Sequence, residues 1–251
     1  HKLDPRVKLA GTMLYIISLF TADGPICYLL AVFALAAVIH LSTVPFKFMA
    51  RGLKSIVIIL LITVSFNLFL TPGTSIIDVW LLRHITWEGL EKAVYMGIRL
   101  ILLILGSSIM TLTTTPNALT DGLEKSLGFL KKVKIPVHEI AMTMSIALRF
   151  IPILIEETDK IMKAQTARGA DFESGGFIKK AKAMVPLLVP LFISAFRRAS
   201  DLAMAMEARC YHGDENRTKM KPLKYSAIDR KAYLCLLLYM VVMVALAVMW
   251  K

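Results

Sequence analysis

Five long apolar blocks constrain this chain more than any other feature of its sequence. They cover residues 9–20, 26–41, 55–70, 93–112 and 233–250. With their flanking residues, the blocks approach the roughly 20 residues that an α-helix needs to cross the ~30 Å hydrocarbon core of a bilayer. The chain is also 57% hydrophobic, with a mean hydropathy of +0.64, whereas soluble domains are roughly half apolar or less. The sequence therefore predicts an all-α membrane protein with about five transmembrane helices.

Charge sets the expected orientation of these spans. The chain carries 30 Lys and Arg against 18 Asp and Glu, and most of the basic residues flank apolar blocks. This placement argues against nucleic acid as a partner and follows the positive-inside rule. Residues 45–54 hold Lys47, Arg51 and Lys54, whereas the turn at residues 21–25 holds no basic residue. We expect the N-terminus in the cytoplasm, and the C-terminus and the segment with Trp80 and Trp87 outside.

A basic region separates the fourth apolar block from the last one. An amphipathic helix is expected over residues 117–136, followed by apolar stretches at residues 140–155 and 183–196. Pro152 interrupts the first stretch, and Pro186 and Pro190 interrupt the second, so both helices should bend. We expect long, bent amphipathic helices lying at or below the cytoplasmic membrane surface. The predicted organisation is a membrane domain over residues 1–114, a cytoplasmic or interfacial helical domain over residues 115–230 and a final span over residues 231–251.

These two long helices carry patterns suited to packing against each other. In the first, four apolar positions fall on one helical stripe: Leu154, Ile155, Ile161 and Met162. In the second, alanine recurs every four residues at positions 195, 199 and 203, which lets a neighbouring helix approach closely.

The ends of the two helices repeat the pattern A-x-x-A-R at an offset of 41 residues. The candidate binding residues are Ala167, Arg168 and Gly169 in the first copy, and Ala208, Arg209 and Cys210 in the second. Small neighbours leave space for another surface, and a guanidinium suits a carboxylate in a groove. Arginine in a last helical turn is also favourable simply because it faces the negative end of the helix dipole. Two copies on paired helices favour the binding interpretation.

Gly169 is a natural helix stop, whereas the second copy has a cysteine at the matching position. We therefore expect the second helix to continue toward Gly213, with a different local backbone around Cys210.

The chain resembles the transmembrane T component of energy-coupling factor (ECF) transporters over nearly its whole length. The resemblance rests on Leu3-Asp4-Pro5-Arg6 with Lys8-Leu9 before the first span, and on the two A-R-G-like helix ends. Cys210 departs from the glycine of that motif.

The resemblance implies a scaffold subunit in a bacterial or archaeal cell membrane. Such a subunit joins two ATP-binding-cassette (ABC) ATPases to a small membrane S component that captures a vitamin or other micronutrient. Arg168 and Arg209 would each enter a groove on one ATPase. This subunit would be non-catalytic and bind no cofactor itself, with ATP and Mg²⁺ held by the ATPases. The sequence contains no G-x-x-x-x-G-K-[ST] phosphate loop.

Two alternatives remain open. A conventional ABC-importer permease would line the substrate path itself, but it usually offers one coupling helix. An intramembrane enzyme would need an acid or histidine in register with Ser107, Ser108 or Thr111, and none is present. These hydroxyls are expected to bond their own helix backbone. The cysteines and histidines show no metal-ligand spacing.

Arg99, inside the fourth block, either faces a polar interior or partner, or snorkels to the membrane surface.

Overall fold

The computed structural model describes residues 3–22, 24–42, 44–70, 86–172, 176–211, 213 and 223–249. It divides into two compact units, His1–Leu123 with Leu223–Lys251, and Glu124–Pro222. Within the described ranges the regular elements are α-helices and one 3-10 helix, which confirms the all-α prediction.

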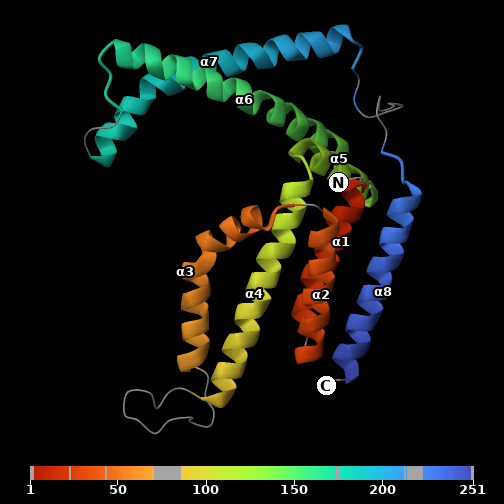
Figure 1. Ribbon diagram of the computed structural model, residues 1–251. Coiled ribbons are helices and arrows are strands. Elements are labelled where there is room, and N and C mark those ends of the chain that lie inside the picture. The colour runs from red at the N-terminus through yellow and green to blue at the C-terminus, as the bar shows by residue number, and fades with distance from the viewer. Residues whose placement is uncertain are drawn as a thin grey trace. The chain divides into compact units, whose positions relative to one another are not determined.

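The first unit is built around α4. Its elements are α1 (Pro5–Thr21), α2 (Pro25–Ser42), α3 (Phe46–Leu70), α4 (Trp87–Thr113), most of α5 (Pro116–Ser126) and α8 (Ala227–Met249). Helix α4 contacts α1, α2 and α3, while α8 contacts α1 and α2, so the long helices lie side by side (Figure 1). The last apolar block of the sequence therefore packs beside the first two.

Large apolar side chains cover the outside of this unit. On α8 the exposed ones include Leu234, Leu237, Leu238, Val241 and Val248. Water would penalise such a surface, whereas lipid tails are as apolar as these side chains. By length and composition, five of the described helices could cross a membrane, namely α2, α4, α6, α7 and α8, and the bent α3 would make a sixth. The protein is a multi-pass membrane protein.

Helix α3 has a bend of 57° between Lys47–Lys54 and Ile56–Leu68. The bend lies where the sequence places the change from the basic segment 45–54 to the apolar block 55–70. The expected outer segment with Trp80 falls within residues 71–85, outside the described residues. Trp87 is the first residue of α4 and is exposed.

A polar cluster joins the starts of α1 and α8. The buried Asp229 carboxylate accepts hydrogen bonds from the backbone N–H of Asp4 at 2.9 Å and from the N–H and Oγ of Ser226, both at 2.7 Å. Asp4 is the N-cap of α1, because its side chain accepts from the N–H of Arg6 at 2.9 Å. Arg6 in turn donates to the carbonyl of Leu223 at 2.9 Å. We call Asp4, Arg6, Ser226 and Asp229 the polar cluster.

The same end of the unit also holds the end of α4. Lys8 donates from Nζ to the carbonyl of Thr113 at 2.7 Å, and Thr113 is the last residue of α4. A cation at this position satisfies a carbonyl that the helix leaves without a partner. The L-D-P-R-x-K segment therefore links α1 to both α4 and α8.

The ring of Tyr15 on α1 packs directly against Gly106 on α4. A β-carbon at Gly106 would lie only 2.7 Å from Cε1 of Tyr15, so any larger residue would displace the ring. Small residues that allow such approach are the usual means of helix packing in membranes. The buried core around this contact includes Leu19, Leu102 and Leu105.

The second unit contains the 3-10 helix η1 (Leu127–Val133), α6 (Val137–Ala167) and α7 (Phe177–Ala208). The expectation of one helix over residues 117–136 is wrong, because α5 ends at Ser126 and η1 follows it. Lys134 then takes a positive φ of 62°, which ends the helical run before α6. Helices α6 and α7 contact each other, as their patterns predict.

Prolines lie inside both long helices, at position 152 of α6 and at positions 186 and 190 of α7. Figure 1 shows that α7 changes direction along its length. Proline removes a backbone hydrogen bond and clashes with the preceding turn, which accounts for such a bend. Length and composition would also allow α6 and α7 to span a membrane, so their surface position stays a prediction.

We predict that Asp229→Ala lowers the free energy of unfolding by about 2–4 kcal/mol, because three donors lose a charged acceptor in a buried site. Asp229→Asn should cost less, since it keeps an acceptor oxygen. Ala227, exposed at the start of α8, offers a control in Ala227→Ser. The measurement is denaturant unfolding of the purified chain in detergent, and equal stability of all four proteins would contradict the role of the polar cluster.

Candidate functional site

The first arginine motif forms a complete C-terminal cap of α6. Helix α6 ends at Ala167, Arg168 is the C-cap residue with φ −88° and ψ 6°, and Gly169 has a left-handed φ of +88°. The N–H of Gly169 donates to the carbonyl of Thr166 at 2.9 Å, and that of Ala170 to Gln165 at 3.0 Å. This pair of bonds is a Schellman motif, which satisfies two of the carbonyls that the end of the helix leaves without a partner.

The second motif forms the same cap on α7. Helix α7 ends at Ala208, and Arg209 is the C-cap residue with φ −92° and ψ 12°. Cys210 takes a positive φ of 55° and donates its N–H to Glu207 at 2.8 Å. Tyr211 donates to Met206 at 3.1 Å. The two helix ends therefore share one hydrogen-bond pattern at an offset of 41 residues.

This geometry corrects the expectation for Cys210. The helix does not continue toward Gly213, and the backbone at position 210 is not different in kind from that at position 169. The cysteine accepts the left-handed conformation because the two capping hydrogen bonds require it. A side chain in that region costs roughly 1–2 kcal/mol relative to glycine.

Both motif arginines face outward. Arg168 and Arg209 are exposed, and so are the alanines before them, Ala167 and Ala208. Within the described residues, neither guanidinium has a hydrogen-bond or ion-pair partner. Each arginine therefore offers its full set of donors to an outside acceptor, beside small side chains that leave room for it.

An ion pair joins the two helices where they contact. Arg198 of α7 lies 3.0 Å from Glu157 of α6, measured from Nη2 to Oε2, and also donates from Nε to Ser194 at 3.4 Å. Glu157 and Arg198 are themselves 41 residues apart, so they hold matching positions in the repeat. The ion pair therefore joins corresponding positions of the two helices.

Glu157 lies in an acidic run with Glu156 and Asp159, a pattern that by itself indicates a solvated helix face and not a contact with α7. The offset of 41 residues alone does not single out this pair, because Glu139–Lys180, Glu156–Arg197 and Lys160–Asp201 have the same spacing and opposite charges.

An apolar groove of about 300 Å³ lies between the two helices. The expected alanine stripe lines it at positions 195, 199 and 203, opposite Ile146, Phe150 and Leu154. The four residues of the predicted apolar stripe on α6 differ in burial. Leu154 and Ile161 are half-buried, whereas Ile155 and Met162 are exposed.

Ser107 and Thr111 bond the backbone of their own helix, as expected, and so does Thr113. Ser107 donates to the carbonyl of Ile104 at 3.1 Å, Thr111 to Ser107 at 3.3 Å and Thr113 to Ile109 at 2.8 Å. Among the described residues, no three His, Cys, Asp or Glu side chains lie together so as to hold a metal ion. The helix ends are therefore the candidate site.

Comparisons with known proteins agree on one relationship. Residues 1–220 match the family CbiQ, described as cobalt transport protein. The chain is 53% identical over 234 residues to the "energy-coupling factor transporter transmembrane protein EcfT" of Thermosediminibacter oceani, covering 93% of this chain and 88% of the relative. A protein of the same name from Clostridium kluyveri is 51% identical over 252 residues, covering 100% and 93%. Another from Bacillus subtilis is 47% identical over 237 residues, covering 94% and 89%.

We predict that Gly169→Ala loosens the last turn of α6, because alanine in the left-handed region costs about 1 kcal/mol or more. Amide hydrogen exchange in that turn should become roughly fivefold faster. Cys210→Gly should slow exchange in the last turn of α7. Gly176→Ala is the control, since Gly176 has φ −70° and open space around its α-carbon. Unchanged exchange in both motif variants would contradict the capping geometry.

We predict that Arg198→Glu lowers the melting temperature of the chain by a few degrees, because it places two negative charges together at the helix contact. The reversed pair, Glu157→Arg with Arg198→Glu, should recover most of the loss in a double-mutant cycle. Arg197→Glu is the matched control, because it makes the same charge change at an exposed neighbouring position. Additive losses in the double variant would show that the pair makes no contribution.

Proposed function

This chain belongs to the T-component family of ECF transporters, and from that membership we propose that it transmits movement between subunits. Two ABC ATPases would close on ATP, move α6 and α7, and so reorient a small membrane S component that holds the substrate. The substrate class is a vitamin or another micronutrient. The chain itself would be non-catalytic, with ATP and Mg²⁺ bound by the ATPases.

The observation that carries this proposal is the matched pair of helix ends. Arg168 and Arg209 stand at identical caps, exposed and flanked by alanine. Two similar grooves on two ATPases would accept two such ends. A groove with a carboxylate would hold the guanidinium fork through two parallel hydrogen bonds, which fixes direction as well as position.

The contact between α6 and α7 supports transmission through both helices together. The Glu157–Arg198 pair and the alanine stripe join the helices part-way along their lengths. A displacement applied at one arginine end would therefore reach the other helix through this contact. The exposed apolar side chains of α7, such as Ile193 and Phe196, would be available to the S component.

The two ends differ in the side chains around their shared backbone. Gln165 and Thr166 precede the first arginine, whereas Met206 and Glu207 precede the second. We infer that the two arginines meet two different ATPases. Equal binding of one purified ATPase at both ends would contradict this inference.

The proposed orientation follows the charge distribution. The N-terminus and the second unit would face the cytoplasm, where the ATPases and ATP are, and the C-terminus would face outward. The basic residues of the segment 45–54 would lie on the same cytoplasmic side.

We predict that Arg168→Ala and Arg209→Ala each weaken ATPase attachment by about 2 kcal/mol, or roughly 30-fold in Kd, because each removes a charged hydrogen-bonding anchor. The double variant should lose the ATPases and coupled substrate uptake. The measurement is affinity purification of the tagged chain from its own membranes in mild detergent, with mass spectrometry of the proteins recovered.

Arg197→Ala is the matched control, an exposed arginine of α7 outside the motif. It should retain the ATPases. A double variant that binds the ATPases as well as the original chain would contradict the proposed role. Recovery with an extracellular substrate-binding protein in place of an S component would favour the conventional permease.

A further inference from the structure

Helices α6 and α7 bury matching positions of the repeat. In α6, Leu154, Ile161 and Gln165 are half-buried. The positions 41 residues later in α7 are 195, 202 and 206, and all three are half-buried and line the groove between the helices. Figure 1 shows the two helices crossing, with their C-terminal ends on opposite sides of the crossing. Each end can therefore meet a partner of its own.

A second set of matching positions lies on the outer face of each helix. Positions 160, 163 and 166 of α6 follow one another at intervals of three, so their side chains form one row along the helix. At about 100° per residue, the middle of this row lies about 180° around the helix from the half-buried positions 154, 161 and 165. The row therefore points away from α7.

Positions 201, 204 and 207 of α7 form the same row, and all six side chains are exposed. We call the first set (Lys160, Lys163 and Thr166) the first outer row, and the second set (Asp201, Met204 and Glu207) the second outer row.

The two outer rows carry opposite charges. The first contains two lysines, and the second contains an aspartate and a glutamate. From position 160 to the C-cap, α6 carries three basic residues and no acid, a net charge of +3. The matching positions 201–209 of α7 carry two acids and one arginine, a net charge of −1. Counting the exposed Asp171 beyond the first cap still leaves +2. Two helix ends with the same backbone therefore present different potentials.

Glu207 gives no advantage to its own helix. It lies in the last turn of α7, where the negative end of the helix dipole disfavours a carboxylate. The matching residue of α6 is the neutral Thr166. Position 207 is only about 3 Å along the helix axis from Arg209, well within the Debye length of roughly 8 Å at physiological salt. The acid therefore acts on any charged group that approaches Arg209, and it favours a basic one.

We propose that the outer rows select which ATPase each helix end holds. This inference rests on the proposed function, in which Arg168 and Arg209 each enter a groove on one ATPase. The first outer row fits an ATPase with an acidic surface beside its groove, and the second fits an ATPase with a basic residue there. The arginines give both ends the same anchor. The wrong pairing brings like charges together, and such repulsion is a main source of specificity between similar partners.

The test identifies the ATPase at each helix end by photo-cross-linking. Benzoylphenylalanine replaces Ala164 or Ala205, which are exposed at matching positions one turn before the arginines and outside the outer rows. The full chain is purified with its ATPases from its own membranes in mild detergent, irradiated and analysed by mass spectrometry. We expect position 164 to cross-link mainly to one ATPase and position 205 mainly to the other.

A second chain carries the two outer rows exchanged, with both caps unchanged. It combines Lys160→Asp, Lys163→Met and Thr166→Glu with Asp201→Lys, Met204→Lys and Glu207→Thr. We expect the ratio of the two ATPases at each cross-linking position to change about tenfold or more, toward the opposite partner. The smaller exchange of Thr166→Glu with Glu207→Thr should change the ratio in the same direction by less. All replaced side chains are exposed, so the contact between α6 and α7 stays in place.

Glu156→Arg with Arg197→Glu is the matched control. It also exchanges opposite charges at matching exposed positions, but these lie 12 residues before the arginines, about 18 Å along the axis. At that distance salt screens the charges, so the choice of ATPase should not change.

Two results would overturn the inference and leave the proposed function standing. One is a different ATPase at each end with a ratio that the exchanged rows do not alter. The other is the same ATPase at both ends of the original chain. If neither end of the original chain cross-links to an ATPase, the proposed function itself fails, and this inference fails with it.

Discussion

The carboxylate of Asp229 is the interaction on which the first unit depends. Lipid tails offer no hydrophobic driving force for one apolar helix to leave them for another, so helices in a membrane need specific contacts to choose their neighbours. Asp229 provides such a contact, because it accepts from Asp4 at the start of α1 and from Ser226 at the start of α8. Asp4 and Asp229 are 225 positions apart, so one buried acid joins the first helix of the unit to its last. The cap of α1, the Arg6 bond to Leu223 and the Lys8 bond to α4 all lie around it.

The two units are held in different ways, and the difference suits their proposed roles. The first has a buried core, a close glycine contact and the polar cluster. In the second, α6 and α7 bury few side chains, and their contact rests on one partly exposed ion pair and a stripe of alanines. Such a contact costs little to rearrange compared with a packed core, since partly exposed pairs are weak. A rigid membrane bundle and a loosely joined helix pair are what a subunit needs if it stays in place while its coupling helices move.

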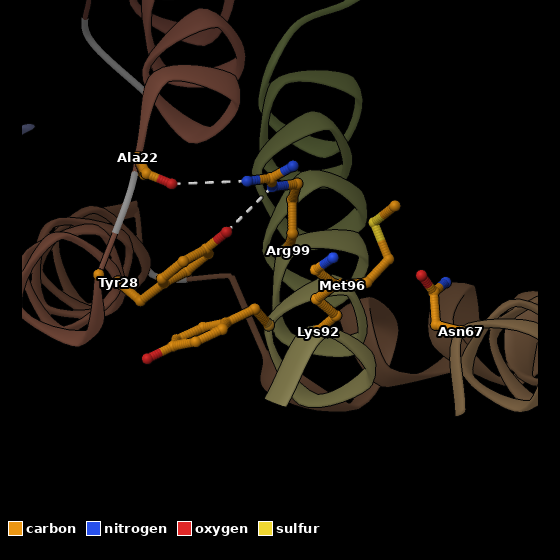
Figure 2. A pocket seen from close by; sticks show the side chains of 8 residues that line it. Ala22, Tyr28, Asn67, Lys92, Met96 and Arg99 are labelled. Carbon is orange, nitrogen blue, oxygen red and sulfur yellow. Dashed lines mark hydrogen bonds between the residues drawn. The ribbon is translucent and has the colours of Figure 1, made fainter. Parts of the chain in front are cut away.

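The sequence predicted the parts of the fold that depend on local pattern. The apolar blocks mark α2, α3, α4 and α8 because a span must be long and apolar, and the alanine stripe marks the face of α7 that meets α6. The contacts of Asp4 and Arg6 could not be predicted in the same way. Their partners follow residue 222, and only the packing of α8 beside α1 brings them together. Arg99 could be predicted only in part. The sequence shows that a charge within an apolar span is energetically costly, but the contact of Arg99 with Tyr28 (Figure 2) depends on how α2 packs against α4.

The error at Cys210 shows what the arginine repeat specifies. Glycine was taken as the signal for the cap, yet the cysteine copy forms the same two hydrogen bonds with the same backbone. Glycine lowers the cost of the left-handed residue but does not create the cap. The bond to Gln165 in the first copy has its counterpart in the bond to Met206 in the second, where cysteine replaces glycine. What the two copies share is therefore an arginine at the C-cap position, with a small residue before it. The backbone fixes the position of each arginine at its helix end. The neighbouring side chains differ between the two copies, so they are the part that could distinguish one partner from another.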